Sequence, residues 1–281
     1  MSDELRLQIR HHTGFHYEGH AKSSYNEARM TTQTSPTQAV EQTRLAVRPV
    51  VPTYSYLDYF GTLVTAFDIG EIHDDLEVES TSTVITRPAV VGIPMQWRDV
   101  DDESFIDRMG EYLTLTRRTE IPEAALAGVD QWRTAADLHE TVAAVGEFVR
   151  GRVQYVTGST NVSTTATEAW DRGQGVCQDM THLTLGILRS LGIPARYVSG
   201  YFYPKKTVEM EETIRAQSHA WVEYFSGEWT GIDPTNGIGH TARHIVVGRG
   251  RDYGDVSPLK GIYQGPKSTG TGAVVEITRL P

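Results

Sequence analysis

The 281-residue chain is 39% hydrophobic and 22% charged, which is sufficient for a packed globular fold of two domains. Its 36 acidic residues against 26 Lys and Arg give a net charge of -10. This balance argues against a nucleic-acid-binding surface and against a polybasic membrane anchor.

Cys177 is the single cysteine, so an intramolecular disulfide is excluded and a reducing compartment is favoured. The N-terminus carries acidic residues early and lacks the apolar core of a signal peptide. No stretch approaches the ~20 apolar residues of a membrane helix. We therefore expect a soluble cytoplasmic protein without nucleic-acid or membrane partners; the oligomeric state is left open.

The first part of the chain, residues 1–90, has the alternation of β-strands. Leu5, Leu7 and Ile9 alternate with polar residues, and the same period of two returns at 62–67 and 76–78. Turn signals separate these runs. The pattern predicts a β-rich N-terminal domain, folded as an antiparallel β-sandwich of roughly seven strands.

Four histidines cluster in this segment: His11, His12, His16 and His20. Three of them are spaced by four residues, which would align them on a helix, but the segment has the pattern of strand and turn. Carboxylate partners for a metal site are not evident either. We therefore expect ordinary sheet histidines and no metal site.

Residues 91–130 are predicted to be a linker. The acidic run at 99–103 lacks the alternating oxygen ligands and the turn glycine of a calcium loop. It is interpreted as a solvated linker or the start of a helix.

The third part, residues 131–281, changes to a helical period. Apolar residues on one face predict a helix after Thr134, and a second, short helix is expected around 167–170. A third helix follows Cys177 and ends before Gly192, which is its C′ residue, with Pro194 soon after. Strands are expected at 195–203 and 273–279, with a hairpin over 218–233.

Cys177 follows a glycine-containing turn, at the predicted start of a helix. The partial positive charge and unpaired N–H groups of a helix N-terminus stabilise a thiolate and an oxyanion. Taken alone, a cysteine beside a buried helix is more often a small core residue.

His219 and Asp233 lie on the two strands of the predicted hairpin. If its turn centres on Ser226, the two residues are directly opposite, and the carboxylate can orient the imidazole. A two-residue turn would put Asp233 on the wrong face. The chemistry therefore requires an odd-length turn, such as three residues with Gly227 in the left-handed conformation.

Three blocks resemble the core of the transglutaminase-like superfamily: Gly-Val-Cys-Gln-Asp followed by Leu-Gly-Ile-Pro-Ala-Arg, then Ser-His-Ala-Trp-Val-Glu, then Gly-Glu-Trp-Thr-Gly-Ile-Asp-Pro-Thr. They span residues 134–240. The first ninety residues, including Asp58-Tyr59-Phe60-Gly61, resemble the β-rich region that precedes this core in bacterial members. The resemblance implies an α+β fold with a papain-like catalytic domain, and a catalytic triad of Cys177, His219 and Asp233.

The resemblance also implies a reaction. The thiolate attacks an amide, an amine leaves, and a second nucleophile resolves the thioester, with no cofactor required. Water makes the enzyme a peptidase or amidase, and an amine makes it a transglutaminase. Hydrolysis, or transfer on peptide-like substrates, is preferred here. An inactive binding module that keeps the fold is the alternative; a metal hydrolase would need a ligand cluster that the sequence does not show.

Other residues near the blocks carry weaker expectations. Asp179 is interpreted mainly as favouring the helix N-terminus, and Gln174 as a loop residue that could also offer an amide to the oxyanion. His182 and Trp170 are expected in the core or behind the site. The remaining candidates for the cleft are Trp221, His240, His244 and residues 249–253.

Overall fold

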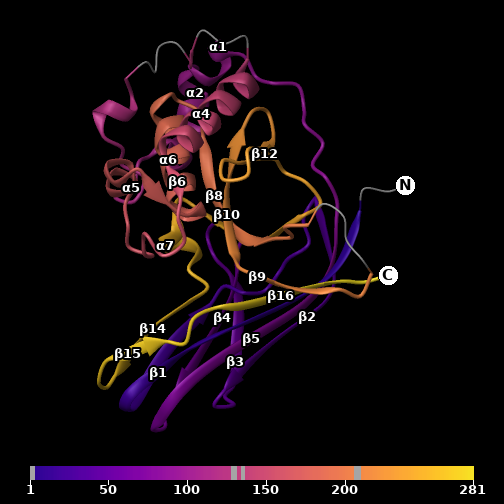
Figure 1. Ribbon diagram of the computed structural model, residues 1–281, viewed down its shortest axis with the longest axis vertical. Coiled ribbons are helices and arrows are strands. Elements are labelled where there is room, and N and C mark those ends of the chain that lie inside the picture. Colours follow the sequence, from indigo (N-terminus) through magenta and orange to yellow (C-terminus); the bar gives the residue numbers. More distant parts are fainter. Residues whose placement is uncertain (1–3, 128–131, 134–136, 206–209) are drawn as a thin grey trace.

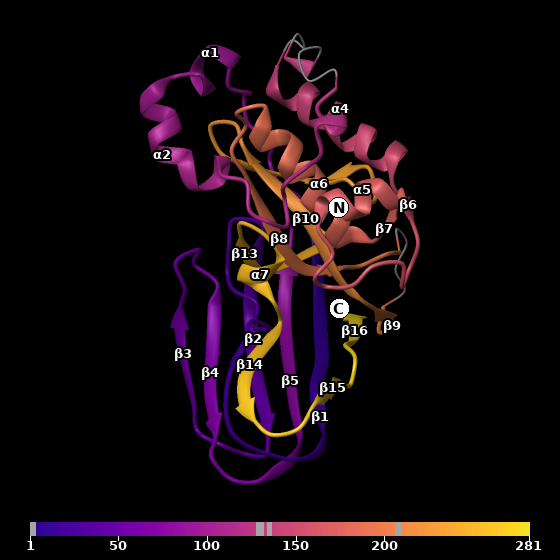
Figure 2. The same cartoon turned by 90° about the vertical axis from the view of Figure 1, so that its left-hand side faces the viewer.

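A computed structural model describes residues 4–127, 132–133, 137–205 and 210–281. Figures 1 and 2 show two layers: a long, curled β-sheet below and a smaller sheet covered by helices above. This arrangement confirms the predicted α+β class. Every helix of the described ranges is too short or too polar to cross a lipid bilayer.

The long sheet is built around β1 (Leu5–Ala28), a strand of 24 residues. Leu7, Ile9 and His11 are buried while their neighbours are more exposed, as the alternation predicted. The described part of residues 1–90 contains five strands, fewer and longer than expected. The other four are β2 (Gln38–Arg48), β3 (Thr53–Leu57), β4 (Leu63–Ile69) and β5 (His73–Thr86).

Strands from the end of the chain complete this sheet. β16 (Val274–Arg279), β15 (Ser268–Gly270) and β14 (Leu259–Gln264) all pair with β1, and β9 (Thr213–Ala216) pairs with β16. The N-terminal sheet therefore includes residues far beyond position 90. The domain boundaries at residues 90 and 131 remain a prediction.

The segment predicted as a linker contains α1 (Trp97–Val100), α2 (Glu103–Leu113) and the 3₁₀ turn η1 (Glu123–Ala125). Asp102 caps α2 by accepting a hydrogen bond from the backbone N–H of Phe105 at 3.1 Å. The acidic run at 99–103 thus covers the end of α1 and the start of α2, so of its two interpretations the structure supports a helix start.

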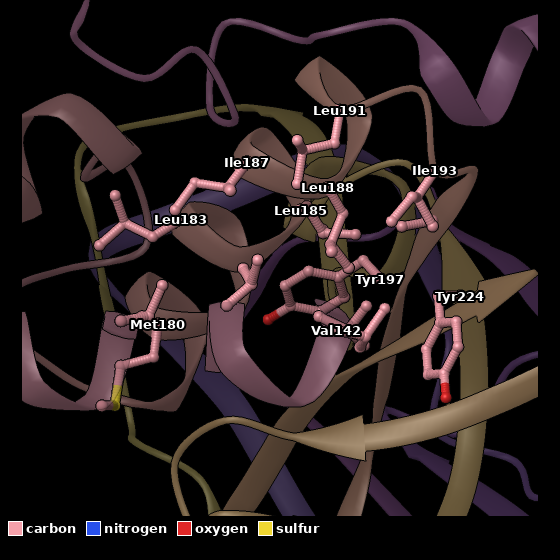
Figure 3. Close-up of a cluster of buried hydrophobic side chains, with 14 of the residues drawn as sticks. Val142, Met180, Leu183, Leu185, Ile187, Leu188, Leu191, Ile193, Tyr197 and Tyr224 are labelled. Atoms are coloured by element: carbon pink, nitrogen blue, oxygen red, sulfur yellow. The ribbon is translucent and has the colours of Figure 1, made fainter. Parts of the chain in front are cut away.

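The smaller sheet is antiparallel, in the order β12-β11-β10-β8-β13. The buried helix α6 packs against β8 and β10. Figure 3 shows Leu183, Ile187 and Leu188 of this helix in one cluster of buried hydrophobic side chains with Tyr197 and Tyr224 of the sheet. The remaining bounds are α4 (Leu138–Arg152), β6 (Gln154–Tyr155), α5 (Ala166–Arg172), β7 (Gln174–Gly175), α6 (Cys177–Ser190), β8 (Ala195–Phe202), β10 (Ser218–Phe225), β11 (Trp229–Asp233), β12 (Ile238–Gly239), β13 (His244–Gly250) and α7 (Tyr253–Val256).

A second apolar cluster joins the two layers. Leu7 and Ile9 of β1 pack with Tyr201 of β8 and Ile245 of β13, all of them buried. Burial of such apolar surface stabilises the contact by about 25 cal/mol per Å². The smaller sheet, whose β10 carries His219, is therefore held between α6 and the long sheet.

Candidate functional site

Cys177 is the first residue of α6, and the chain enters the helix through the short strand β7. Asp179, fully buried, accepts hydrogen bonds from the N–H of Val176 at 2.7 Å and from the hydroxyl of Thr160 at 2.6 Å. A Cβ on Gly175 would lie 2.8 Å from the Cβ of Asp179, so glycine is needed there. Asp179 therefore favours the helix N-terminus, as expected, and ties it to the neighbouring loop.

His219 and Asp233 come from the hairpin of β10 and β11. Phe225 pairs with Trp229, which leaves a three-residue turn, and Gly227 has φ +81°. The odd-length turn is confirmed. The prediction that His219 lies directly opposite Asp233 is wrong, because the same register, continued along the two strands, puts Trp221 opposite Asp233. The two side chains still share a face of the sheet, and Nε2 of His219 lies 2.7 Å from Oδ2 of Asp233.

The electrostatics of this pair favour its charged form. Burial alone would lower the pKa of His219, but hydrogen bonds to Asp233 and to Cys177 raise it above the ordinary histidine value. Burial would raise the pKa of Asp233, but hydrogen bonds from His219 and His244 hold it well below the ordinary value. Since Nε2 of His219 is engaged by Asp233, Nδ1 is left for Cys177.

Two further residues fix the Asp233 carboxylate. The Asn236 side chain donates from Nδ2 to Oδ2 at 2.6 Å, and Nε2 of His244 lies 3.3 Å from the same oxygen. The backbone N–H of Thr241 donates to Nδ1 of His244 at 3.1 Å, so Nε2 carries the proton. His244 is thus a neutral donor to Asp233. Its burial is the largest cause of a pKa below the ordinary histidine value, which agrees with this neutral form.

His219, Asp233 and His244 also form a group of potential metal ligands, with ligand atoms within 4.8 Å of one another. The sequence did not reveal this cluster. Oδ2 of Asp233 is the shared hydrogen-bond acceptor of both rings, at 2.7 Å from Nε2 of His219 and 3.3 Å from Nε2 of His244. The donor set is therefore used internally, as an orienting network.

A cleft of about 270 Å³ opens beside Cys177 and His219. Its wall contains Tyr253 from α7, which lay in the candidate loop 249–253, and Tyr155 from β6, which the sequence analysis missed. Gln178 also lines the cleft, while the side chain of Gln174 is exposed outside it. The complete wall is Tyr155, Val162, Val176, Cys177, Gln178, Tyr197, Ser199, Gln217, Ser218, His219, Ala220, Tyr253, Pro258 and Ala273.

The other candidates lie behind the site. His182 is fully buried and its Nε2 accepts the N–H of Tyr253 at 3.2 Å, which fixes the Tyr253 loop against α6. Trp221 is buried beside His219, with ring centroids 6.1 Å apart. His240 stacks on His244 at 5.1 Å. Trp170 packs on the helical core, as expected.

The N-terminal histidines have carboxylate neighbours that the sequence analysis did not expect. Nδ1 of His16 lies 2.7 Å from Asp75, and Nδ1 of His20 lies 2.5 Å from Asp74. These are separate, exposed pairs along β1 and β5. In the described part of the chain, only the group at Asp233 brings three such ligands together.

The fold and the arrangement of these side chains are those of a transglutaminase-like core preceded by a β-rich region. Comparison with known families agrees: residues 127–234 match the transglutaminase-like superfamily, and residues 7–85 match the bacterial transglutaminase-like N-terminal region. The chain belongs to the transglutaminase-like superfamily.

Relatives extend over almost the whole chain. The uncharacterized protein ML0607 of Mycobacterium leprae is 41% identical, covering 98% of this chain and 99% of that protein. The uncharacterized protein Rv2569c of Mycobacterium tuberculosis is 30% identical, covering 93% and 88%. A candidate cysteine protease from Cytophaga hutchinsonii has the same fold, with a TM-score of 0.78 at 20% identity, covering 100% of this chain and 92% of that one.

Proposed function

We propose that the protein is a cysteine-dependent enzyme that cleaves or transfers amide bonds of peptide-like substrates, with Cys177, His219 and Asp233 as its catalytic triad. The observation that carries this proposal is the 2.7 Å hydrogen bond between His219 and Asp233, made beside a thiol at the N-terminus of α6. An inactive binding module has no chemical need for all three residues in contact.

In the proposed reaction the Cys177 thiolate attacks the amide carbonyl carbon while His219 holds the thiol proton. The first-turn N–H groups of α6 have no carbonyl four residues earlier within the helix, so they are suited to stabilise the oxyanion. The C–N bond then breaks, and His219 gives its proton to the leaving amine. A thioester to Cys177 remains.

The second half restores the thiol. Water or a primary amine attacks the thioester and passes a proton to His219, the C–S bond breaks, and Cys177 is regenerated. Hydrolysis is the preferred outcome in this proposal, because Tyr155 at the rim of the cleft is partly exposed and the site is open to solvent. We also propose a cytoplasmic location, on the basis of the single free cysteine.

A peptide-library incubation followed by mass spectrometry tests the proposal, with and without an added primary amine. Gain of water at a cleaved bond indicates hydrolysis, and gain of the amine indicates transfer. The Cys177→Ala protein is the matched control and should give neither product. If wild type and this variant leave the same library unchanged, the binding-module alternative replaces the enzyme.

A further inference from the structure

We propose that a second hollow, which lies beyond His219, binds the amine part of the substrate. Arg215 in its wall selects amine parts that carry a carboxylate. This inference rests on the proposed function and names the substrate class for the same site. The hollow has a volume of about 500 Å³. Its wall is Tyr155, Phe202, Pro204, Arg215, Ala216, Gln217, Ser218, His219, Thr235 and Asn236.

The two hollows meet at His219. Tyr155, Gln217, Ser218 and His219 line both of them, whereas Cys177 lines only the smaller one. The acyl group must be bonded to Cys177, which places it in the smaller hollow. The leaving amine must receive its proton from His219, so the larger hollow, which has His219 but not Cys177, is the one left for it.

The charge of the two hollows differs from that of the chain as a whole. Neither wall contains an Asp, Glu or Lys among the described residues, although the chain has 36 acidic residues and a net charge of -10. Arg215 is the single arginine among the described residues of the larger wall. Among these described wall residues, a cationic amine component would find no carboxylate, while an anionic one would find the guanidinium of Arg215.

Arg215 lies on β9, directly across from Glu276 of β16. The carboxylate of Glu276 accepts a hydrogen bond from Arg10 at 3.1 Å on its other side. In the described ranges, no acidic group lies within ion-pair distance of Arg215 itself. Its side chain is exposed, so its planar fork of donors is available to a carboxylate in a two-point contact.

The rest of the wall fits a short peptide segment. Phe202, Pro204 and Ala216 offer apolar contact, and Gln217 and Thr235 offer hydrogen bonds to a backbone. Arg215 can bind either an acidic side chain just after the scissile bond or the free carboxyl terminus of the leaving segment. Both sources present the same carboxylate chemistry.

Direct binding of three dipeptide probes tests the inference without requiring turnover. Glu-Gly amide carries a side-chain carboxylate, Gly-Gly a terminal carboxylate, and Gly-Gly amide neither. Titration by NMR should show at least one acidic probe binding wild type about tenfold more tightly than Gly-Gly amide. Which acid binds better identifies the source of the carboxylate.

Arg215→Gln should reduce this preference to less than about twofold, and Arg215→Lys should retain part of it. Arg44→Gln removes an exposed arginine of β2 and should keep the wild-type preference. Equal binding of all three probes to wild type, or an unchanged preference in Arg215→Gln, overturns the inference. Alkylation of Cys177 by neutral iodoacetamide should be equal in wild type and Arg215→Gln, so a failed nucleophile is recognised separately.

Discussion

Asp233 and His219 form a 2.7 Å hydrogen bond even though the hairpin register places Trp221, and not His219, across from Asp233. The two residues are diagonal neighbours on one face; diagonal neighbours in antiparallel pairs are roughly 7–8 Å apart, with their Cβ atoms somewhat closer. The imidazole is long enough to bring its Nε2 within hydrogen-bond distance of the Asp233 carboxylate. The Asp233 carboxylate can therefore be exchanged for an amide without changing the register of the sheet.

Asp233→Asn should lower kcat by about 10²- to 10⁴-fold while the protein stays folded, since the imidazole loses the carboxylate that orients it. Steady-state kinetics on a substrate from the library screen measures this, and circular dichroism checks the fold. Asp171→Asn makes the same exchange at an exposed position of α5 and is a control that should retain activity. A kcat within twofold of wild type would show that Asp233 does not orient His219.

Cys177 should alkylate readily below pH 7, where an ordinary thiol, which ionises near pH ~8.5, is almost fully protonated. The raised pKa of His219 keeps the imidazole charged beside the sulfur, and this charge favours the thiolate. The iodoacetamide rate is measured between about pH 5 and 9 in wild type and His219→Ala. His219→Ala should lose most of the low-pH rate; one shared curve with an inflection near ~8.5 would identify an ordinary thiol.

Local sequence pattern predicted the type of most elements but not their pairing. The alternation of Leu5, Leu7 and Ile9 indicated a strand, and the spacing after Cys177 indicated a helix that ends before Gly192. Nothing local indicated that Val274–Arg279 returns to pair with β1, because partners more than two hundred residues apart leave no periodic signal. The same limit applied to β9, and so to the position of Arg215.

The residues of the candidate site also divide into those that local sequence predicted and those whose place depends on strand pairing. Cys177, His219 and Asp233 were predicted because each lies in a recognisable block, and the chemistry required the odd-length turn in which Gly227 is left-handed. His244 was left undecided, since its contact with Asp233 depends on where β13 joins the sheet. Tyr155 reaches the cleft through the short parallel pairing of β6 with β7, which two residues cannot reveal in sequence.

His244→Ala should lower kcat by about tenfold and narrow the pH range of activity, because Asp233 loses a neutral donor and holds its proton more readily. Since this hydrogen bond helps to keep the pKa of Asp233 low, the acidic limb of the kcat profile should move to higher pH. His244→Gln, which can still donate, should restore part of the rate. The pH profile separates a positioning role from a packing defect, which would lower kcat equally at every pH.

The buried ion pairs of Glu223 should make the fold sensitive to acid. Its carboxylate lies 2.5 Å from Nη2 of Arg196 and 2.8 Å from Nε of Arg249. Burial would raise the pKa of Glu223, but the two guanidinium groups outweigh it and lower the pKa from 4.5 to about 2. A depressed carboxyl pKa stabilises the folded state above the unfolded value, so this contribution is complete above about pH 4.5 and is lost as the pH falls toward 2.

The contribution is on the order of 3 kcal/mol, and urea unfolding at several pH values measures it. Glu223→Gln should be less stable than wild type at neutral pH, because it leaves Arg196 and Arg249 without their buried partner. The difference between the two proteins should then shrink steadily between about pH 4.5 and 2, since wild type loses what the variant already lacks. Glu18→Gln changes an exposed position on β1, and its free energy of unfolding should run parallel to that of wild type at every pH. Parallel curves for Glu223→Gln and wild type would show that the charge of Glu223 adds nothing to the stability of the fold.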